Sequence, residues 1–246
     1  MEQKIHSMEH RIHFISYGNK RYNKAKERIK KEALDTGWFD SVKIYEQKDL
    51  TIEFSEKYKE VLGMSRGGGY WIWKLDIIKQ ELSKINDGDI LVYCDAGCVV
   101  NKNGEKRFRE YVAMLGKSDK GIISFQMNTP EKKWTIKEIF NYFDLEVESK
   151  IGKSGQINAT VIILKKCKHI GILLDKYEKL LDYNMFLVTD KYNNEKQDPI
   201  FRDNRHDQSI FSIIRKIYGS IMLEDETAKK YKNIEKSPFI AMRKRK

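Results

Sequence analysis

Short apolar runs alternate with polar, glycine-containing segments along the chain, and each run predicts a buried strand. The strongest is residues 90–93 (Ile-Leu-Val-Tyr), which leads directly into Cys94-Asp95-Ala96-Gly97. Further strands are predicted at residues 13–18, 41–46, 121–125 and 159–164.

Helical patterns fill most of the intervals between these strands. Residues 23–36 end at the stop signal Gly37, and residues 74–85 carry the apolar stripe of an amphipathic helix. Other helices are predicted at residues 54–62, 108–115, 135–143, 170–181 and 207–218, whereas residues 182–205 are polar and loop-like. Strands alternating with helices predict an α/β fold: one Rossmann-like domain with a mixed, mostly parallel sheet covered by helices. Its core would span residues 12–225, followed by a basic, weakly patterned tail at 228–246.

Composition restricts the class of protein. A chain of 246 residues can bury a sufficient core without disulfides. Its formal net charge of +11 favours nucleic acid, an anionic membrane surface or phosphorylated small ligands as partners. Three cysteines without a CxxC pair predict a reducing compartment. Because neither a signal core nor an apolar run of about 18 residues is found, we expect a cytoplasmic protein whose basic tail contacts the inner membrane face.

The candidate chemistry starts at Asp95, directly after the strongest strand. Ligands of open α/β sheets bind at the carboxyl ends of strands, and a carboxylate there can hold a divalent cation against a diphosphate. Gly97 would let phosphates approach the backbone. The alternative is an ordinary turn after a strand.

Arg66 precedes Gly67-Gly68-Gly69 and is a second candidate, because a guanidinium beside a flexible glycine run suits phosphate oxygens. The run matches neither a P-loop nor a dinucleotide fingerprint. A mobile loop, with Trp71 and Trp73 packed on the sheet, is the alternative.

Two further clusters suit sugar recognition. Residues 204–209 (Asn-Arg-His-Asp-Gln-Ser) precede an apolar helix, and their carboxylate and amide groups can bind vicinal hydroxyls; Asp207 may equally be read as the helix N-cap. Trp134 beside Thr135 can form a stacking platform for a sugar ring, or the staple and cap of a helix.

Together these segments resemble a known family. Residues 69–74 (GYWIWK), 87–97 (DGDILVYCDAG) and 205–209 (RHDQS) are similar to the ordered patterns GYWxWKP, DGDIxxYxDAG and RHDQS of bacterial and viral polysaccharide glycosyltransferases. The similarity spans residues 12–225. It implies a GT-A fold, a nucleotide-sugar donor and a Mn²⁺ or Mg²⁺ ion.

The resemblance also implies roles for single residues. Asp95 matches the first Asp of the metal-binding DxD motif, and Asp207 with Gln208 matches the pair that faces the donor sugar. Gly97 replaces the second DxD carboxylate, which puts the metal in doubt; Asp225 is a substitute ligand.

The expected function is transfer of a hexose-type sugar from a UDP-linked (or GDP-linked) donor to a glycan or lipid-linked glycan of the cell surface, assisted by metal at Asp95. An inverting reaction would use Asp207 as base, and a retaining one would place the Asp-Gln pair beside the oxocarbenium charge. The expected donor site is Tyr17, Gly18, Arg66, Lys74, Asp95, Ala96, Gly97 and His206; the catalytic pair is Asp207 and Gln208; the acceptor site is Trp134 and Thr135. The alternatives are a nucleotidyltransferase or a nucleic-acid-binding protein, although no nucleic-acid module is recognisable.

Overall fold

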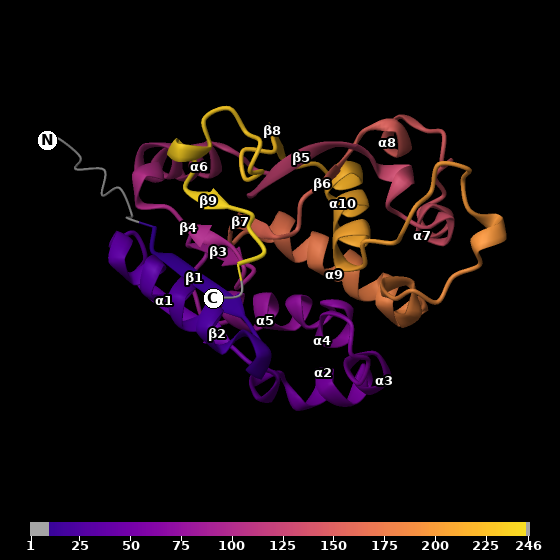
Figure 1. Cartoon of the computed structure of the whole chain (residues 1–246), viewed down its shortest axis with the longest axis horizontal. Helices are drawn as coiled ribbons and strands as arrows, with labels where there is room; N and C mark the ends of the chain where they lie inside the picture. The colour runs from indigo at the N-terminus through magenta and orange to yellow at the C-terminus, as the bar shows by residue number, and fades with distance from the viewer. Residues whose placement is uncertain (1–9, 245–246) are drawn as a thin grey trace, which may run out of the picture.

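The computed structural model of the chain describes residues 10–244, and a mixed sheet forms its centre (Figure 1). Within these residues the sheet has seven strands in the order β2-β1-β3-β7-β5-β6, with β8 paired to β5. The pairs β1–β2, β1–β3 and β5–β8 are parallel, whereas β7 runs antiparallel to β3 and β5, and β6 antiparallel to β5. The strands are β1 (Ile12–Tyr17), β2 (Ser41–Tyr45), β3 (Ile90–Cys94), β5 (Ile122–Pro130), β6 (Gly155–Ile157), β7 (Val161–Lys165) and β8 (Ile221–Glu224).

Both faces of the sheet are covered, as the strand and helix patterns predict. Successive side chains of a strand point to opposite faces, so Ile90 and Val92 pack with α1 (Asn23–Thr36) and α6 (Glu105–Lys117). Leu91 and Tyr93 pack on the other face, in the cluster that contains side chains of α5 (Trp73–Leu82), α9 (Lys168–Tyr183) and α10 (Asp207–Tyr218). The fold is therefore a single three-layer α/β unit across the described residues.

The segment between β2 and α5 departs from the prediction. The single helix expected at residues 54–62 is broken at Tyr58 into α2 (Ile52–Lys57) and α3 (Lys59–Leu62). Residues 67–70 form the short turn α4 (Gly67–Tyr70) instead of a mobile loop, with positive φ at all three glycines. A Cβ on Gly69 would lie 2.8 Å from the Leu62 Cα, so this turn requires glycine. Two short helices, α7 (Lys137–Tyr142) and α8 (Lys150–Lys153), follow β5.

The basic tail is the main correction to the sequence-based prediction. Residues 228–244 fold back onto the domain, and β9 (Phe239–Ile240) pairs antiparallel with β4 (Val99–Val100), beside which it lies in Figure 1. Phe239 is 1% exposed and meets the Phe108 ring edge-on at a centroid distance of 5.7 Å. The last two basic positions, 245 and 246, lie outside the described residues. No helix of residues 10–244 is long and apolar enough to cross a bilayer.

We predict that Phe239→Ala lowers the free energy of unfolding by about 3–5 kcal/mol, because it removes a buried aromatic side chain. Ile52→Ala is the control: Ile52 is 78% exposed, so its loss should change stability by about 0.5 kcal/mol or less. Urea denaturation of the two variants makes the comparison. Equal, small effects would mean that the C-terminal strand does not belong to the core.

Candidate active site

A pocket of about 1060 Å³ opens at the carboxyl ends of β1 and β3. Because β7 is antiparallel to β3, the residues that precede it reach the same edge: the Asp95 amide donates to the Thr160 carbonyl at 2.9 Å. The start of α10 and the C-terminal segment complete the walls. Of the residues predicted from the sequence, those that line the pocket are Tyr17, Gly18, Arg66, Lys74, Asp95, Ala96, Gly97, Trp134, His206, Asp207, Gln208 and Asp225.

A buried ion pair forms the floor of the pocket. The Lys74 ammonium lies 2.6 Å from the Asp207 Oδ2 and donates to the Ala159 carbonyl at 2.9 Å. The Asp95 Oδ1 lies 3.5 Å from the same ammonium nitrogen. Lys74 is 4% and Asp207 6% exposed, so water does little to screen this pair. Its role is broader than the phosphate or ribose contact predicted for Lys74, since it joins two carboxylates on different elements.

In the pKa values of Lys74 and Asp207, the effect of burial opposes the effect of the neighbouring charges. Burial raises the pKa of Asp207 to about 6, although Lys74 opposes the shift. Burial by itself would lower the pKa of Lys74, but Asp207 and Asp95 raise it above its ordinary value. Both groups are therefore charged at neutral pH, and the carboxylate becomes protonated in mild acid.

The start of α10 holds Asp207 in place. His206, not Asp207, occupies the N-cap position, with φ 61° and ψ −124°, and Asp207 is the first helical residue; the N-cap interpretation of Asp207 is thus wrong. Tyr70 and Trp71 also have positive φ, and their rings lie 4.9 and 5.4 Å from that of His206. Such conformations cost about 1–3 kcal/mol each and persist only where the surroundings enforce them.

Gln208 is oriented through both ends of its amide. Its Nε2 donates to the Gln156 Oε1 at 2.7 Å, and its Oε1 accepts from the Ala159 amide at 3.2 Å. Gln156 donates in turn to Glu131, which is fully buried and also accepts from the Thr135 hydroxyl at 2.6 Å. Thr135, predicted to contact an acceptor, is not among the described residues lining the pocket and supports this network from behind.

Trp134 does line the pocket, and so do the stacked side chains of Tyr17 and Trp73. The Tyr17 and Trp73 rings are parallel within 16° at 3.7 Å. A Cβ on Gly18 would lie 2.8 Å from the Lys26 side chain. This part of the pocket lining is therefore aromatic.

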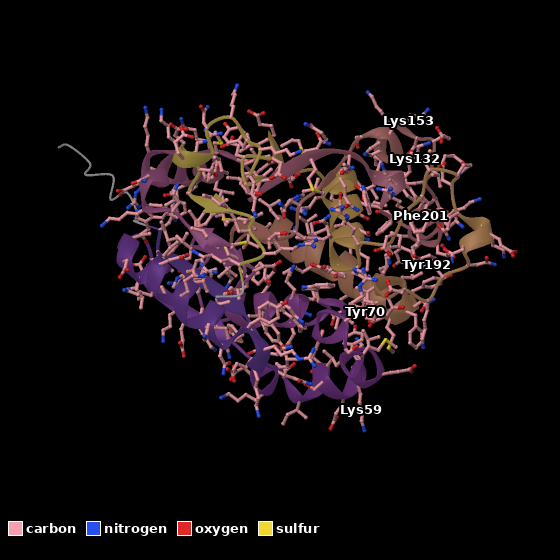
Figure 2. The ribbon with its side chains drawn as sticks, in the orientation of Figure 1. Lys59, Tyr70, Lys132, Lys153, Tyr192 and Phe201 are labelled. Atoms are coloured by element: carbon pink, nitrogen blue, oxygen red, sulfur yellow. The ribbon has the colours of Figure 1, made fainter. Side chains whose placement is uncertain are left out.

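Arg66 lies at the pocket edge with its guanidinium already engaged. It bonds Asp190 at 2.8 Å and Asp203 at 3.0 Å. Tyr70 donates a hydrogen bond to the same Asp190. In Figure 2, Tyr70 lies on the same side of the molecule as Tyr192. A phosphate would have to displace two carboxylates, so the geometry favours a structural role for Arg66.

The residues around Asp95 do not fit a resident divalent cation. The Asp95 Oδ1 accepts from the Tyr93 hydroxyl at 2.5 Å and faces the Lys74 ammonium. Gly97 brings no carboxylate, and Asp225 accepts from the Thr227 hydroxyl at 2.6 Å. Within residues 10–244, no group of three His, Cys, Asp or Glu side chains is placed to hold a metal ion.

Sequence reasoning missed Gln156 and Glu131, and it missed that residues 241–243 line the pocket. Gln156 lies on a three-residue strand and Glu131 on a short turn. Neither has a motif around it, so only their contacts reveal them.

The fold is shared with solved glycosyltransferases. The chain is similar over 94% of its length to a glycosyltransferase involved in glycosylation of the major capsid of PBCV-1, with 11% identity, a TM-score of 0.51 and 91% of that chain covered. Mouse xyloside xylosyltransferase 1 matches 92% of the chain at 12% identity and a TM-score of 0.50, with 93% covered. The bifunctional glycosyltransferase WbbM matches 95% at 8% identity and a TM-score of 0.54, over 46% of its own length. The chain therefore has the GT-A fold that the motif resemblance implied. No protein-family model and no curated protein matches its sequence.

We predict that Lys74→Met destabilises the protein by about 3–5 kcal/mol, because it leaves the Asp207 carboxylate buried without its cation. The double variant with Asp207→Asn should recover part of this loss. Lys79→Met, on the exposed side of the same helix, should cost about 1 kcal/mol or less. Denaturant titration measures all three; a Lys74→Met loss no larger than that of Lys79→Met would argue against the buried pair.

Proposed function

We propose that the protein is a glycosyltransferase that moves a hexose-type sugar from a UDP- or GDP-linked donor to a surface-glycan acceptor. The observation that carries the proposal is the buried Asp207, paired with Lys74 and flanked by an oriented Gln208 at the floor of the pocket. The GT-A fold supports the reaction class. Of the two donors, the UDP-linked sugar is the one we favour.

In the proposed complex the donor extends along the pocket. The nucleoside lies beside Tyr17 and Gly18, and the diphosphate lies next to the backbone of Ala96 and Gly97, within reach of the rim. The sugar faces Asp207 and Gln208, and Trp134 offers its ring to the acceptor. His206 also lines the pocket.

The transfer breaks the bond between the anomeric carbon and the diphosphate oxygen, whose electron pair stays with the diphosphate. A new bond forms from the acceptor hydroxyl oxygen, and its proton leaves to the departing diphosphate. Positive charge develops on the sugar ring, and the Asp207 carboxylate stabilises it in a site with little water. Gln208 hydrogen-bonds the sugar hydroxyls through the second N–H of its Nε2 and the second acceptor position of its Oε1. The first of each is engaged with Gln156 and Ala159.

A nucleotidyltransferase has less support from the site. Paired-metal chemistry needs two or three carboxylates at one place, and Asp95 and Asp207 instead share the Lys74 ammonium. The basic tail, which together with the net charge suggested nucleic-acid binding, packs against the domain through β9.

We predict that Asp207→Asn leaves UDP affinity unchanged and lowers kcat about hundredfold or more, since the lost charge acts mainly in the transition state. Calorimetry with UDP and a kinetic assay with a panel of nucleotide sugars test this. Asp35→Asn, an exposed position outside the pocket, serves as the charge-matched control and should match wild type. A near-normal kcat for Asp207→Asn would contradict the proposed role.

The pH dependence follows from the raised pKa of Asp207. The active form carries the carboxylate, so kcat/KM should be level from about pH 7 upward and fall as pH drops through the pKa of about 6. One unit below it, activity should be about tenfold lower. The acid limb should be absent from the residual activity of Asp207→Asn; the same limb in that variant would assign it to another group.

A further inference from the structure

The C-terminal segment, residues 237–244, forms one side of the pocket rim. The Ala241 amide donates to the turn after β8 at 2.9 Å, and the Lys244 amide donates to the Gly97 carbonyl at 3.1 Å. Arg243 lies between these two anchors and lines the pocket. Its backbone is therefore fixed beside the strand end that carries Asp95.

Gly97 makes this contact possible. A Cβ at Gly97 would lie 2.9 Å from the Met242 carbonyl oxygen, closer than side-chain carbons approach backbone. The third position of the Asp-Ala-Gly motif thus admits the C-terminal segment at the place where the related motif has a second carboxylate. A basic segment replaces an acidic side chain there, which reverses the local charge.

Arg205 also lines the pocket. Its guanidinium lies 3.9 Å from the centre of the Trp134 ring. Its backbone amide donates to the Trp134 carbonyl at 3.0 Å and to the Ser209 hydroxyl at 2.9 Å. Side chain and backbone are thus both held beside Trp134, and no hydrogen bond from the guanidinium to another residue is found within residues 10–244.

Within the described part of the chain, neither arginine forms a salt bridge. Among the ion pairs of residues 10–244, Arg66 takes Asp203 and Asp190, whereas no carboxylate pairs with Arg205 or Arg243. Burial lowers the pKa of Arg205 and the charge of Arg243 lowers it further, whereas the charge of Asp203 opposes both effects. The two cations therefore repel each other across the rim, and an anion between them would relieve the repulsion.

We propose that Arg205 and Arg243 form an oxyanion-binding site at the rim of the pocket, whose ligand is a phosphate or diphosphate group. Each guanidinium offers paired N–H donors that match two oxygens of one phosphate. The site supplies, from the protein's own side chains, positive charge for a phosphate beside Asp95-Ala96-Gly97. This inference rests on the proposed function for its biological setting, but not for the binding itself.

The phosphate can belong to either substrate. Arg243 lies near the Gly97 backbone, where the donor diphosphate is proposed, and Arg205 lies on Trp134, where the acceptor is proposed. The shared chemistry is recognition of a phosphate oxyanion. Binding of inorganic pyrophosphate measures that chemistry directly.

The test titrates pyrophosphate by calorimetry into wild type, Arg243→Ala, Arg205→Ala and the control Arg202→Ala. Arg202 is exposed, carries the same charge and does not line the pocket. We expect affinity to fall about tenfold or more in the first two variants and to stay near wild type in the control. Arg205→Lys, which keeps the charge and the stem but lacks the fork, replaces Arg205→Ala if that variant fails to fold. Losses no larger than that of Arg202→Ala would overturn the site.

A second titration, into protein saturated with UDP, identifies the source of the phosphate. Competition by UDP, with weakened UDP but unchanged uridine affinity in the variants, assigns the site to the donor diphosphate. Unchanged pyrophosphate binding to the UDP-loaded protein assigns it to a phosphorylated acceptor. Arginine-dependent pyrophosphate binding without any nucleotide-sugar turnover would leave the site standing and reject the transferase proposal instead.

Discussion

The pocket depends on the contacts that the buried ammonium of Lys74 makes with its three partners. Removing an ammonium and a carboxylate from water is costly unless both find partners. The partners of Lys74 come from three separate segments: Asp207 at the start of α10, Ala159 before β7 and Asp95 after β3. One charge therefore holds together three parts of the chain that are remote in sequence, and a polar junction rather than apolar packing defines the floor of the pocket.

The pocket has opposite charges at its two levels. Carboxylates gather at the floor around Lys74, whereas Arg205 and Arg243, which pair with no carboxylate of residues 10–244, lie at the rim. In the proposed complex a nucleotide sugar would place its positively charged transition state over the carboxylates and a phosphate near the arginines. The C-terminal segment occupies the space that Gly97 leaves open beside Asp95.

Local pattern was sufficient for most of the fold. Long periodic segments such as α1 and apolar runs such as β3 were predicted within a few residues, because their hydrophobic period reports which face is buried. The two-residue strand β9 was missed, since so short a segment has no period. The break at Tyr58 was also missed. Its hydroxyl donates to Asp182, 124 residues away, and no local signal encodes such a contact.

The sequence by itself determined the α/β class, the strand that ends in Asp95, and the motif that carries Asp207 and Gln208. Only the tertiary structure decided what these side chains do. It paired Lys74 with Asp207, engaged Arg66 with carboxylates, and turned the basic tail into a wall of the pocket. The reason is physical: secondary structure follows from neighbours along the chain, whereas the charge state and partners of a side chain depend on burial and on residues that only folding brings near.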